Sequence, residues 1–316
     1  MNVMNYTGYG SPDRLVPGCA PRPLHNASQL LIRVLASSVN PIDWKLHDGQ
    51  LRWLMPRRFP SVPGLDLMGQ VEETGRADSP FSCGDRIISL LPPGRGASAE
   101  YCLVDVPGGV VRVPRNMSDL EAAGLPLAGL TAWQGLITLG GVQAGQRVLI
   151  VGASGGVGHF AVQIAKAKAA TVVGVCSGAN RDWVKTLGAD EVVDYTQNRP
   201  WAKERSFDVI FDCVSRLGHA EIQRLLQPEG IYVDTLFKPE LMLRGLMQPL
   251  HTRQRYKSFL VSSRAEDLSE LLALHQAGLL NTHIDSVYDW TQLAEAHRRS
   301  QSGRARGKIV IRVAQP

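Results

Sequence analysis

A glycine-rich stretch, residues 148–158, contains the residue types that bind a phosphate group. It reads VLIVGASGGVG. The apolar and mostly β-branched residues Val148 to Val151 predict a strand that is buried on both faces of a parallel sheet. Gly155, Gly156 and Gly158 then permit a tight turn into a helix, whose free N–H groups and positive dipole end can hold a pyrophosphate.

The segments after the glycines complete a unit of strand, helix and strand that has the size of a dinucleotide site. We predict a helix from about Val157 to Ala169 and a second strand from Thr171 to Val175. Ala153 stands at the first position of the pattern G-x-G-x-x-G, with Gly152 directly before it. A glycine turn without a ligand is the alternative. The residues predicted to bind the cofactor here are Ala153, Ser154, Gly155, Gly156, Val157 and Gly158.

The end of the second strand predicts which nicotinamide cofactor binds. An NAD site usually places an Asp or Glu there, about 20 residues past the glycines, to bind the ribose 2′-hydroxyl. Residues 176–181 read CSGANR, with no carboxylate to repel a 2′-phosphate. Ser177 can donate a hydrogen bond and Arg181 a charge-assisted one, so this segment favours NADPH. The alternative is that Asn180 only caps a short helix and that Arg181 is solvated.

The composition is that of an ordinary globular protein. The 316 residues predict about two domains, with 44% hydrophobic and 20% charged residues. The net charge is +5, and its densest basic stretch, residues 298–308, is interpreted as a solvated face. No aromatic and basic platform indicates a nucleic-acid partner. The five cysteines lie far apart without a C-x-x-C pair, so they predict neither a disulfide framework nor a cysteine zinc cluster.

The chain also lacks the patterns of membrane insertion and secretion. It contains no run of 18 apolar residues, and its first ten residues are not a charged segment followed by an apolar one. We therefore expect a cytoplasmic protein with no membrane partner.

Residues 1 to about 120 are rich in short strands and turns. We predict strands at Leu30 to Leu35, Met68 to Glu72 and Arg86 to Leu91, which together indicate a compact β-barrel-like domain. The pattern changes near residue 119. Ser118 as an N-cap and Glu121 as its capping-box partner predict the start of a helical segment.

Strands and helices alternate from about residue 121, which predicts a doubly wound α/β domain. We expect a helix from Asp267 to Ala277. The predicted strands after residue 190 are Glu191 to Asp194, Phe207 to Val214, Ile231 to Asp234 and Phe259 to Ser262.

Several motifs occur in order along nearly the whole chain: ASSVNPIDWK (36–45), PSVPGLDLMG (60–69), LPLAGLTAW (125–133), residues 145–166, LGADEVVDY (187–195) and GRARGKIV (303–310). They resemble those of the zinc-independent quinone oxidoreductases and enone reductases of the medium-chain dehydrogenase/reductase superfamily. The resemblance implies a GroES-like β-barrel catalytic domain at 1–120, completed by about 281–316. A Rossmann-type cofactor domain is implied at 121–280. The resemblance also implies NADPH-dependent reduction of quinones or α,β-unsaturated carbonyls by a homodimer.

The positions that resemble the zinc ligands of related alcohol dehydrogenases hold other residues. Those enzymes use a Cys and a Gly-His-Glu segment, whereas the segments of this chain that resemble them are Ser38-Val39-Asn40-Pro41 and Gly64-Leu65-Asp66. The second, four-cysteine zinc loop is also missing, so we expect no metal. Thioester-reducing relatives typically carry a Tyr soon after the Asn-Pro segment, and residues 41–64 contain none, which disfavours that branch.

The resemblance also assigns site residues. It implies that Asn40 polarises the substrate oxygen and that Thr131 binds the nicotinamide carboxamide or the substrate oxygen. Lys45 either stabilises an enolate or is simply solvated on a loop. Asp43 is expected to fix local turns through its side chain. Tyr195 resembles the residue that touches the adenylate side of the cofactor, and core packing is its alternative.

Two other functions stay open. One is an NADPH-binding sensor or interaction protein without turnover, and the other is a trans-acting enoyl-thioester reductase. Two further interpretations bear on the site: His159 is expected on the surface of its helix, and Trp53 to Met55 either line an apolar substrate cleft or belong to the core.

Overall fold

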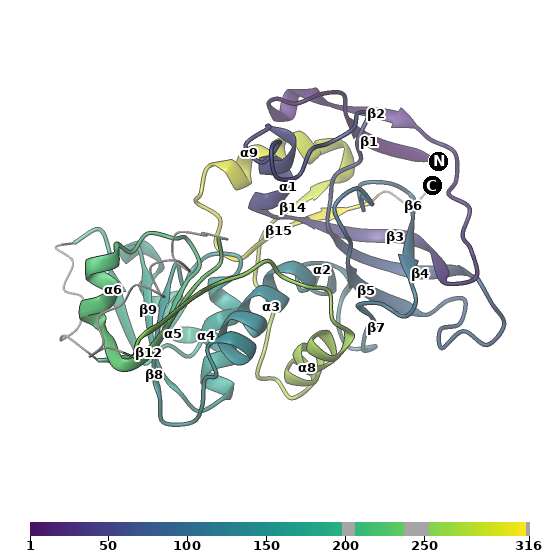
Figure 1. The fold of residues 1–316 in the computed structure, drawn as a ribbon. Helices are drawn as coiled ribbons and strands as arrows, with labels where there is room; N and C mark the ends of the chain where they lie inside the picture. Colours follow the sequence, from purple (N-terminus) through teal and green to yellow (C-terminus); the bar gives the residue numbers. More distant parts are fainter. Residues whose placement is uncertain (198–205, 237–252, 314–316) are drawn as a thin grey trace. The chain divides into compact units, whose positions relative to one another are not determined.

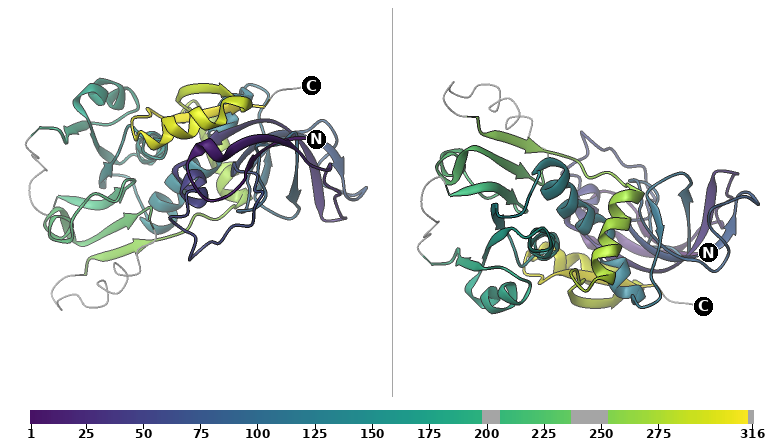
Figure 2. Two further views of the ribbon diagram at one scale, coloured as in Figure 1. Left: turned by 90° about the horizontal axis from the view of Figure 1, so that it is seen from above. Right: turned by 90° about the horizontal axis from the view of Figure 1, so that it is seen from below.

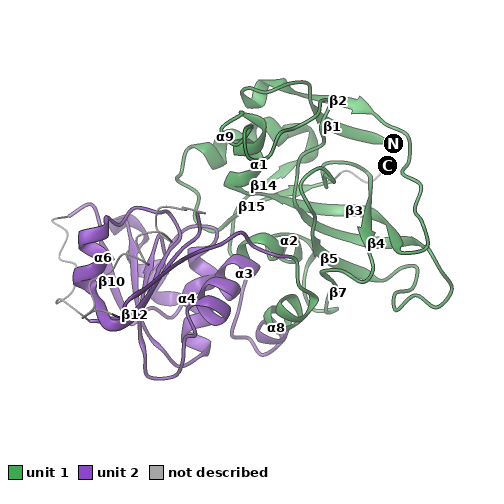
Figure 3. Cartoon of the chain, in the orientation of Figure 1, with its two compact units in different colours: residues 1–128, 263–272, 282–316 green, residues 129–262, 273–281 purple. Residues whose placement is uncertain are grey.

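The computed structural model describes residues 1–197, 206–236 and 253–313 (Figure 1). The chain divides into two compact units, coloured separately in Figure 3. Unit 1 consists of residues 1–128, 263–272 and 282–316, and unit 2 of residues 129–262 and 273–281. Each unit has its own sheet and its own apolar core.

Unit 1 is built on a seven-stranded sheet with the order β14-β15-β3-β4-β5-β7, in which β6 also pairs with β3. Strand β3 pairs with β4 over most of its length, with β6 at residues 29–33 and with β15 at residues 36–39. All three predicted strands of this region are present. The strands are β3 (Gln29–Val39), β4 (Asp66–Thr74), β5 (Arg86–Leu90), β6 (Tyr101–Asp105), β7 (Val110–Arg112), β14 (Ile284–Asp289) and β15 (Lys308–Arg312).

The ends of the chain contribute a second layer to unit 1. Strands β1 (Asn2–Tyr6) and β2 (Leu15–Cys19) form an antiparallel pair. Helix α9 (Leu293–Gln301) packs against α1 (Pro41–His47) and the turn Pro12–Arg14, as the adjoining yellow and purple segments of Figures 1 and 2 show. The predicted capping box is confirmed, because the Ser118 hydroxyl accepts from the Glu121 N–H at the start of α2 (Asp119–Ala123).

Unit 2 contains a six-stranded parallel sheet with the order β10-β9-β8-β11-β12-β13. The chain moves outward from β8 in one direction and returns to lie beside β8 with β11, so the strand order reverses between these two strands. This topology confirms the doubly wound fold. The strands are β8 (Arg147–Val151), β9 (Thr171–Cys176), β10 (Glu191–Asp194), β11 (Phe207–Asp212), β12 (Leu226–Asp234) and β13 (Arg255–Ser258).

The predicted strand Phe259 to Ser262 is wrong. The edge strand β13 ends at Ser258, and the residues after it have no strand pairing. The prediction followed the apolar residues, but the residue of β13 that enters the core is Tyr256, which lies between two basic residues. Because only one side chain of this edge strand is buried, its hydrophobic pattern is too weak to be seen.

The helices of unit 2 lie against particular strands. Helix α4 (Gly158–Ala167) packs on β8 and β9, α5 (Arg181–Thr186) on β9 and β10, and α6 (His219–Leu225) on β12. Two helices contain residues of both units, because the boundaries after residues 128 and 272 fall inside them. They are α3 (Pro126–Trp133) and α8 (Ala265–Gln276).

Candidate functional site

A buried polar network lies at the end of β3 in unit 1. The carboxylate of Asp66, the first residue of β4, is fully buried. It accepts hydrogen bonds from Asn40 Nδ2 at 2.8 Å, from the backbone N–H of Leu127 at 2.7 Å and from the Ser38 hydroxyl. Lys308 Nζ lies 3.3 Å from the same carboxylate and donates to Asn40 Oδ1 at 2.5 Å.

The sheet register explains why these residues meet. Strand β15 pairs with the end of β3, and Ile309 lies opposite Val39. Lys308 therefore begins β15 beside Asn40, the residue that follows β3. The ammonium group is only 2% exposed, and an unpaired charge at that depth would be very unfavourable. Asp66 and Asn40 together compensate it.

The network fixes the orientation of the Asn40 amide. Its oxygen accepts from Lys308, and one of its two N–H bonds is directed at Asp66. The Asn40 side chain also hydrogen-bonds Asp43, which lowers the pKa of that carboxyl group. Asn40 is thus a pre-oriented donor next to a buried positive charge, which is the arrangement that stabilises negative charge developing on an oxygen.

Asp43 supports the same helix start, as the sequence predicted. Its Oδ2 accepts from the backbone N–H of Asn40 at 2.7 Å, and the pair forms a capping box at the start of α1. Burial raises the pKa of Asp43 to about 7. Asp66 also raises this pKa, while the Asn40 hydrogen bonds and the Lys308 charge lower it.

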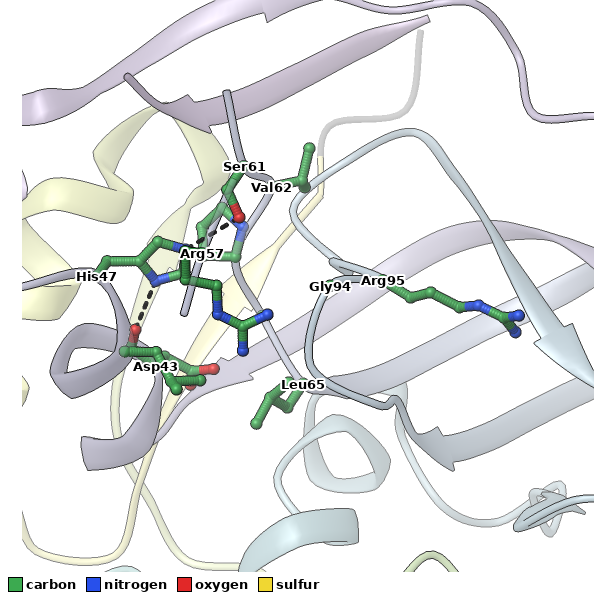
Figure 4. Close-up of a pocket in the computed structure, with 11 residues that line it drawn as sticks. Asp43, His47, Arg57, Ser61, Val62, Leu65, Gly94 and Arg95 are labelled. Carbon is green, nitrogen blue, oxygen red and sulfur yellow. Dashed lines mark hydrogen bonds between the residues drawn. The ribbon is translucent and has the colours of Figure 1, made fainter. Parts of the chain in front are cut away.

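His47 contacts Asp43 (Figure 4) and is the first of three buried aromatic side chains that contact one another in sequence. His47 Nδ1 lies 2.7 Å from the Asp43 carbonyl oxygen, and its ring stacks on Tyr6 with centroids 4.2 Å apart. The Tyr6 hydroxyl lies 3.0 Å from His297 Nδ1. Burial lowers the pKa of His47 and lowers that of His297 to about 3. Both histidines are therefore neutral at physiological pH.

These pKa shifts predict two opposite pH effects on stability. Folded Asp43 binds its proton up to about pH 7, whereas an unfolded Asp loses it near about pH 4, so this group lowers stability as the pH rises between those values. Folded His297 stays neutral down to about pH 3, whereas an unfolded His is protonated below about pH 6.5, so this group lowers stability as the pH falls. In the native chain, the opposite effects of Asp43 and His297 on the pH dependence of stability partly cancel.

We expect Asp43→Asn to remove the contribution of Asp43 to the pH dependence of the free energy of unfolding. The native chain gains stability from Asp43 as the pH falls from about 7 to 4, and the variant does not. Over this range the free energy of unfolding of the variant should therefore fall by on the order of 2–4 kcal/mol relative to that of the native chain. Urea unfolding at a series of pH values measures the difference. His297→Gln, as the matched variant, should change the pH dependence in the opposite direction. Parallel pH profiles for all three proteins would contradict the assignment.

Lys45 takes no part in the buried network. It lies on helix α1, not on the loop that the sequence suggested, and is half-buried. Its Nζ lies 5.5 Å from the centroid of the Trp44 ring. Further along, the side chains of Trp53 and Leu54 are 88% and 62% exposed, so neither belongs to the core.

The glycine-rich turn of unit 2 has the geometry that its sequence predicts. Gly152 adopts a positive φ of 81°, and α4 begins at Gly158. A Cβ on Gly158 would lie 2.1 Å from the Gly152 carbonyl oxygen, so only glycine lets the helix approach the strand this closely. A Cβ on Gly155 would make only an ordinary van der Waals contact, 3.4 Å from the Gly152 carbonyl oxygen. The turn therefore fits a pyrophosphate at the start of α4.

His159 is fully buried, and the expectation that it lies on the helix surface is wrong. Its Nδ1 lies 3.1 Å from the Gly155 carbonyl oxygen, and its ring packs on that of Phe160. It is part of the support beneath the glycine turn.

Asn180 connects the glycine turn to the end of β9. Its Nδ2 donates to Ser154 Oγ at 3.1 Å and to Ser177 Oγ at 3.3 Å. Its side chain does not cap α5. The alternative role of Asn180 as a mere helix cap is therefore wrong. Arg181, the first residue of α5, is exposed.

Asp194 is a neighbour of this site that the sequence analysis missed. It lies opposite Cys176 in the pairing of β10 with β9, and its Oδ2 would lie 2.4 Å from a Cβ on Gly178. Hydrogen bonds from Thr196 lower the pKa of Asp194 most, and the charge of Arg181 lowers it further. A carboxylate thus lies beside the predicted 2′-phosphate position. Only the order of the strands in the sheet reveals it.

Two predicted site residues lie elsewhere in unit 2. Thr131 is buried on α3. Tyr195 directly follows β10 and is 51% exposed, so the alternative that it packs in the core is wrong.

Residues 26–115 match the alcohol dehydrogenase GroES-like domain family, and residues 187–311 match the zinc-binding dehydrogenase family. A chloroplastic quinone oxidoreductase of Triphysaria versicolor is 35% identical, over 98% of both chains. The chain is a quinone oxidoreductase-like member of the medium-chain dehydrogenase/reductase superfamily. The structure of the quinone oxidoreductase from Coxiella burnetii matches this medium-chain dehydrogenase/reductase with a TM-score of 0.86 and 29% identity, over 99% of both chains.

A mitochondrial NAD(P)H oxidoreductase of Danio rerio is 31% identical to this chain, over 96% of the chain and 89% of the relative. The predicted fold class is confirmed by the GroES-like match and the parallel sheet of unit 2. This member of the superfamily is an NAD(P)H-dependent oxidoreductase.

The described ranges contain neither a candidate membrane-spanning helix nor a candidate metal cluster. In residues 1–197, 206–236 and 253–313, no helix combines the length and the apolar character needed to cross a membrane. Within the same ranges, no three His, Cys, Asp or Glu side chains come together as a candidate metal site.

Proposed function

We propose that this chain transfers hydride from NADPH to a quinone or to the C=C bond of an α,β-unsaturated carbonyl, and that it does so without zinc. The observation that carries the proposal is the buried network of Ser38, Asn40, Asp66 and Lys308. Three of these residues, Ser38, Asn40 and Asp66, lie in the two segments that resemble the metal-ligand segments of related zinc alcohol dehydrogenases. A serine hydroxyl that already donates to a carboxylate is a poor zinc ligand, while the Lys308 ammonium supplies a resident positive charge.

Reduction of a conjugated carbonyl or quinone places negative charge on its oxygen, so the site needs donors there and finally a proton. The Asn40 amide is the donor, and Lys308 stabilises the developing charge through the amide that it binds. Thr131 is assigned to the carboxamide or the substrate oxygen. Solvent or Lys45 delivers the proton. When bound, the cofactor supplies the hydride.

Unit 2 supplies the groups that hold the cofactor. Residues 153–158 would hold the pyrophosphate at the start of α4, and Ser177 and Arg181 would bind the 2′-phosphate. Tyr195, half-exposed beside β10, would contact the adenylate side. The Asp194 carboxylate counts against a 2′-phosphate, because the hydrogen bonds from Thr196 and Gly178 lower its pKa and keep it ionised. The Arg181 charge opposes this repulsion, and Arg181 is the group assigned to select NADPH.

We expect Arg181→Ala to lower the ratio of NADPH affinity to NADH affinity by about tenfold or more, because a charge-assisted hydrogen bond is lost only with the phosphorylated cofactor. Fluorescence titration of both cofactors measures the ratio. Lys185→Ala, another exposed basic residue of the same helix, is the matched control and should leave the ratio unchanged. An unchanged ratio in Arg181→Ala would remove this residue from the site.

The proposed activity is tested by NADPH oxidation with a small panel of acceptors: 1,4-benzoquinone, 9,10-phenanthrenequinone, a 2-alkenal, an alkyl enone and crotonyl-CoA. Turnover of quinones alone would assign quinone reduction, and turnover of the alkenal or enone would assign double-bond reduction. Preference for the thioester would favour the enoyl reductase alternative, and bound NADPH without any turnover would favour the sensor. Stoichiometric zinc in the same preparation would contradict zinc independence.

Two further expectations remain proposals. The resemblance implies a homodimer, and the sequence patterns predict a cytoplasmic location. Relatives named as chloroplastic and mitochondrial make the location a matter for direct measurement.

A further inference from the structure

The Asn180 amide joins two serine hydroxyls that belong to different segments of unit 2. Its Nδ2 atom donates to Ser154 Oγ in the glycine turn at 3.1 Å and to Ser177 Oγ after β9 at 3.3 Å. An amide nitrogen carries two N–H bonds, so one nitrogen can serve both hydroxyls. The two hydroxyls therefore converge on a single group.

The end of β9 holds the start of the glycine turn and explains why the two serines meet. The Val175 carbonyl oxygen accepts from the N–H groups of Gly152 at 3.0 Å and Ala153 at 2.9 Å. Ser154 comes directly after these residues, and Ser177 lies two positions beyond Val175. The parallel pairing of β8 with β9 thus places both serines at the carboxyl edge of the sheet, where open α/β sheets bind their ligands.

The segment after β9 folds back so that Asn180 reaches both serines. Its backbone N–H donates to the Ser177 carbonyl oxygen at 2.9 Å, which closes the single turn Gly178–Asn180. On its other side this turn is held by Asp194, which accepts a hydrogen bond from the Gly178 N–H. These backbone contacts position the Asn180 amide, whose side chain does not cap α5.

The bridge determines where the two serine protons are available. A hydroxyl has one O–H bond and two lone pairs. In Ser154 and in Ser177 one lone pair is taken by an N–H bond of Asn180. Among the residues that the structure describes, neither hydroxyl donates to a protein acceptor. Both side chains are half-buried, so a ligand at this edge of the sheet can accept both protons.

We propose that Asn180 is a positioning residue that orients the Ser154 and Ser177 hydroxyls as a pair of donors to the 2′-phosphate of NADPH. This inference rests on the proposed function, in which NADPH is the preferred cofactor. A phosphate can accept from both hydroxyls at once, and hydrogen bonds to a charged acceptor are stronger than those to the neutral 2′-hydroxyl of NADH. The proposal assigns the Ser154 hydroxyl to the 2′-phosphate, while the Ser154 backbone stays in the turn that would hold the pyrophosphate.

The roles of Asn180 and Arg181 in this site are different. Arg181 would supply a positive charge, whereas Asn180 carries no charge and acts through two neutral donors. Asn180 is therefore a second determinant of the preference for NADPH, and its effect requires the serines.

The experiment measures the binding of two cofactor fragments, adenosine 2′,5′-bisphosphate and adenosine 5′-monophosphate, by calorimetry. The two fragments differ only in the 2′-phosphate, so the ratio of their affinities reports on that group. The native chain should bind the bisphosphate more tightly, and Asn180→Ala should lower the ratio about tenfold. Thr186→Ala, which removes an exposed hydroxyl at the other end of α5, is the matched control and should leave the ratio unchanged.

A thermodynamic cycle tests whether Asn180 acts through the serines. Ser154→Ala combined with Ser177→Ala should by itself lower the ratio at least about tenfold. Adding Asn180→Ala to this variant should then change the ratio by less than about twofold, because no hydroxyl is left to orient. An unchanged ratio in the serine variant, or the same loss from Asn180→Ala in both backgrounds, would overturn the proposal.

The same titrations distinguish this inference from the proposed function. If the native chain binds both fragments equally, the preference for NADPH fails, and the role of Asn180 fails with it. If the native ratio is high and Asn180→Ala leaves it unchanged, only the role of Asn180 fails. The fragments carry no nicotinamide, so neither result depends on turnover.

Discussion

Replacing Lys308 with Met should lower the free energy of unfolding by about 3–5 kcal/mol, because it leaves the Asp66 carboxylate charged and buried without its counter-ion. Asp66 is 0% exposed and cannot turn toward solvent. Its remaining donors, Ser38, Asn40 and the Leu127 N–H, are neutral. Urea unfolding followed by circular dichroism measures the loss.

A surface ion pair provides the matched control. Lys166 Nζ lies 2.6 Å from Asp190, which is closer than the 3.3 Å between Lys308 and Asp66. The side chains of Lys166 and Asp190 are 44% and 37% exposed, however. Exposed pairs contribute about 1 kcal/mol or less, so Lys166→Met should have a small effect despite its shorter distance.

A double variant distinguishes charge from packing. Lys308→Met combined with Asp66→Asn removes both charges, so it should be more stable than Lys308→Met alone. If the single and double variants are equally unstable, the loss comes from packing around the lysine stem and not from the stranded carboxylate. Equal effects of Lys308→Met and Lys166→Met would contradict the importance of burial.

Replacing Asn40 with Ala should lower kcat/KM by about 10² to 10³-fold, the usual effect of removing one donor to a developing oxyanion. The change removes the N–H that faces the substrate oxygen in the proposed reaction. It also removes the oxygen that binds Lys308. The loss should appear mainly in kcat, since the interaction strengthens as charge develops. Steady-state kinetics on the preferred acceptor measures it.

The Asn40 variant needs a control, because it also disturbs the network. Ser38→Ala removes a different donor to the same Asp66 carboxylate and leaves the Asn40 amide in place. It should lower stability by a similar amount but kcat/KM by less than about tenfold. If both variants lose activity equally, the network acts through its structure alone, and Asn40 is a positioning residue.

Local patterns were enough to predict most of the fold. The four apolar residues from Val148 to Val151 form a central strand, and the Ser118 and Glu121 pair caps a helix. Both features depend on neighbours within a few positions in the chain. The prediction was wrong at β13, where Tyr256 is the one side chain that enters the core.

The site was predictable only where its residues lie close together in the chain. Ala153 to Gly158 form one turn, and Asn40 and Asp43 form one capping box. Lys308 was instead interpreted as part of a solvated basic stretch. Its burial depends on Asp66, which precedes it by 242 positions. The sequence near Lys308 contains no pattern that indicates a contact with Asp66.

Asp66 and Lys308 lie far apart in the chain, so the ribosome synthesises them at different times. Unit 1 contains both the first and the last segments of the chain. A ribosome that adds roughly 5–20 residues per second needs about 12–50 s to proceed from the carboxylate to its lysine. During that time the strands that will enclose Asp66 exist without their counter-charge, while every residue of unit 2 is made. Unit 2 can therefore complete its sheet first, and the buried ion pair of unit 1 forms only after its final strand emerges.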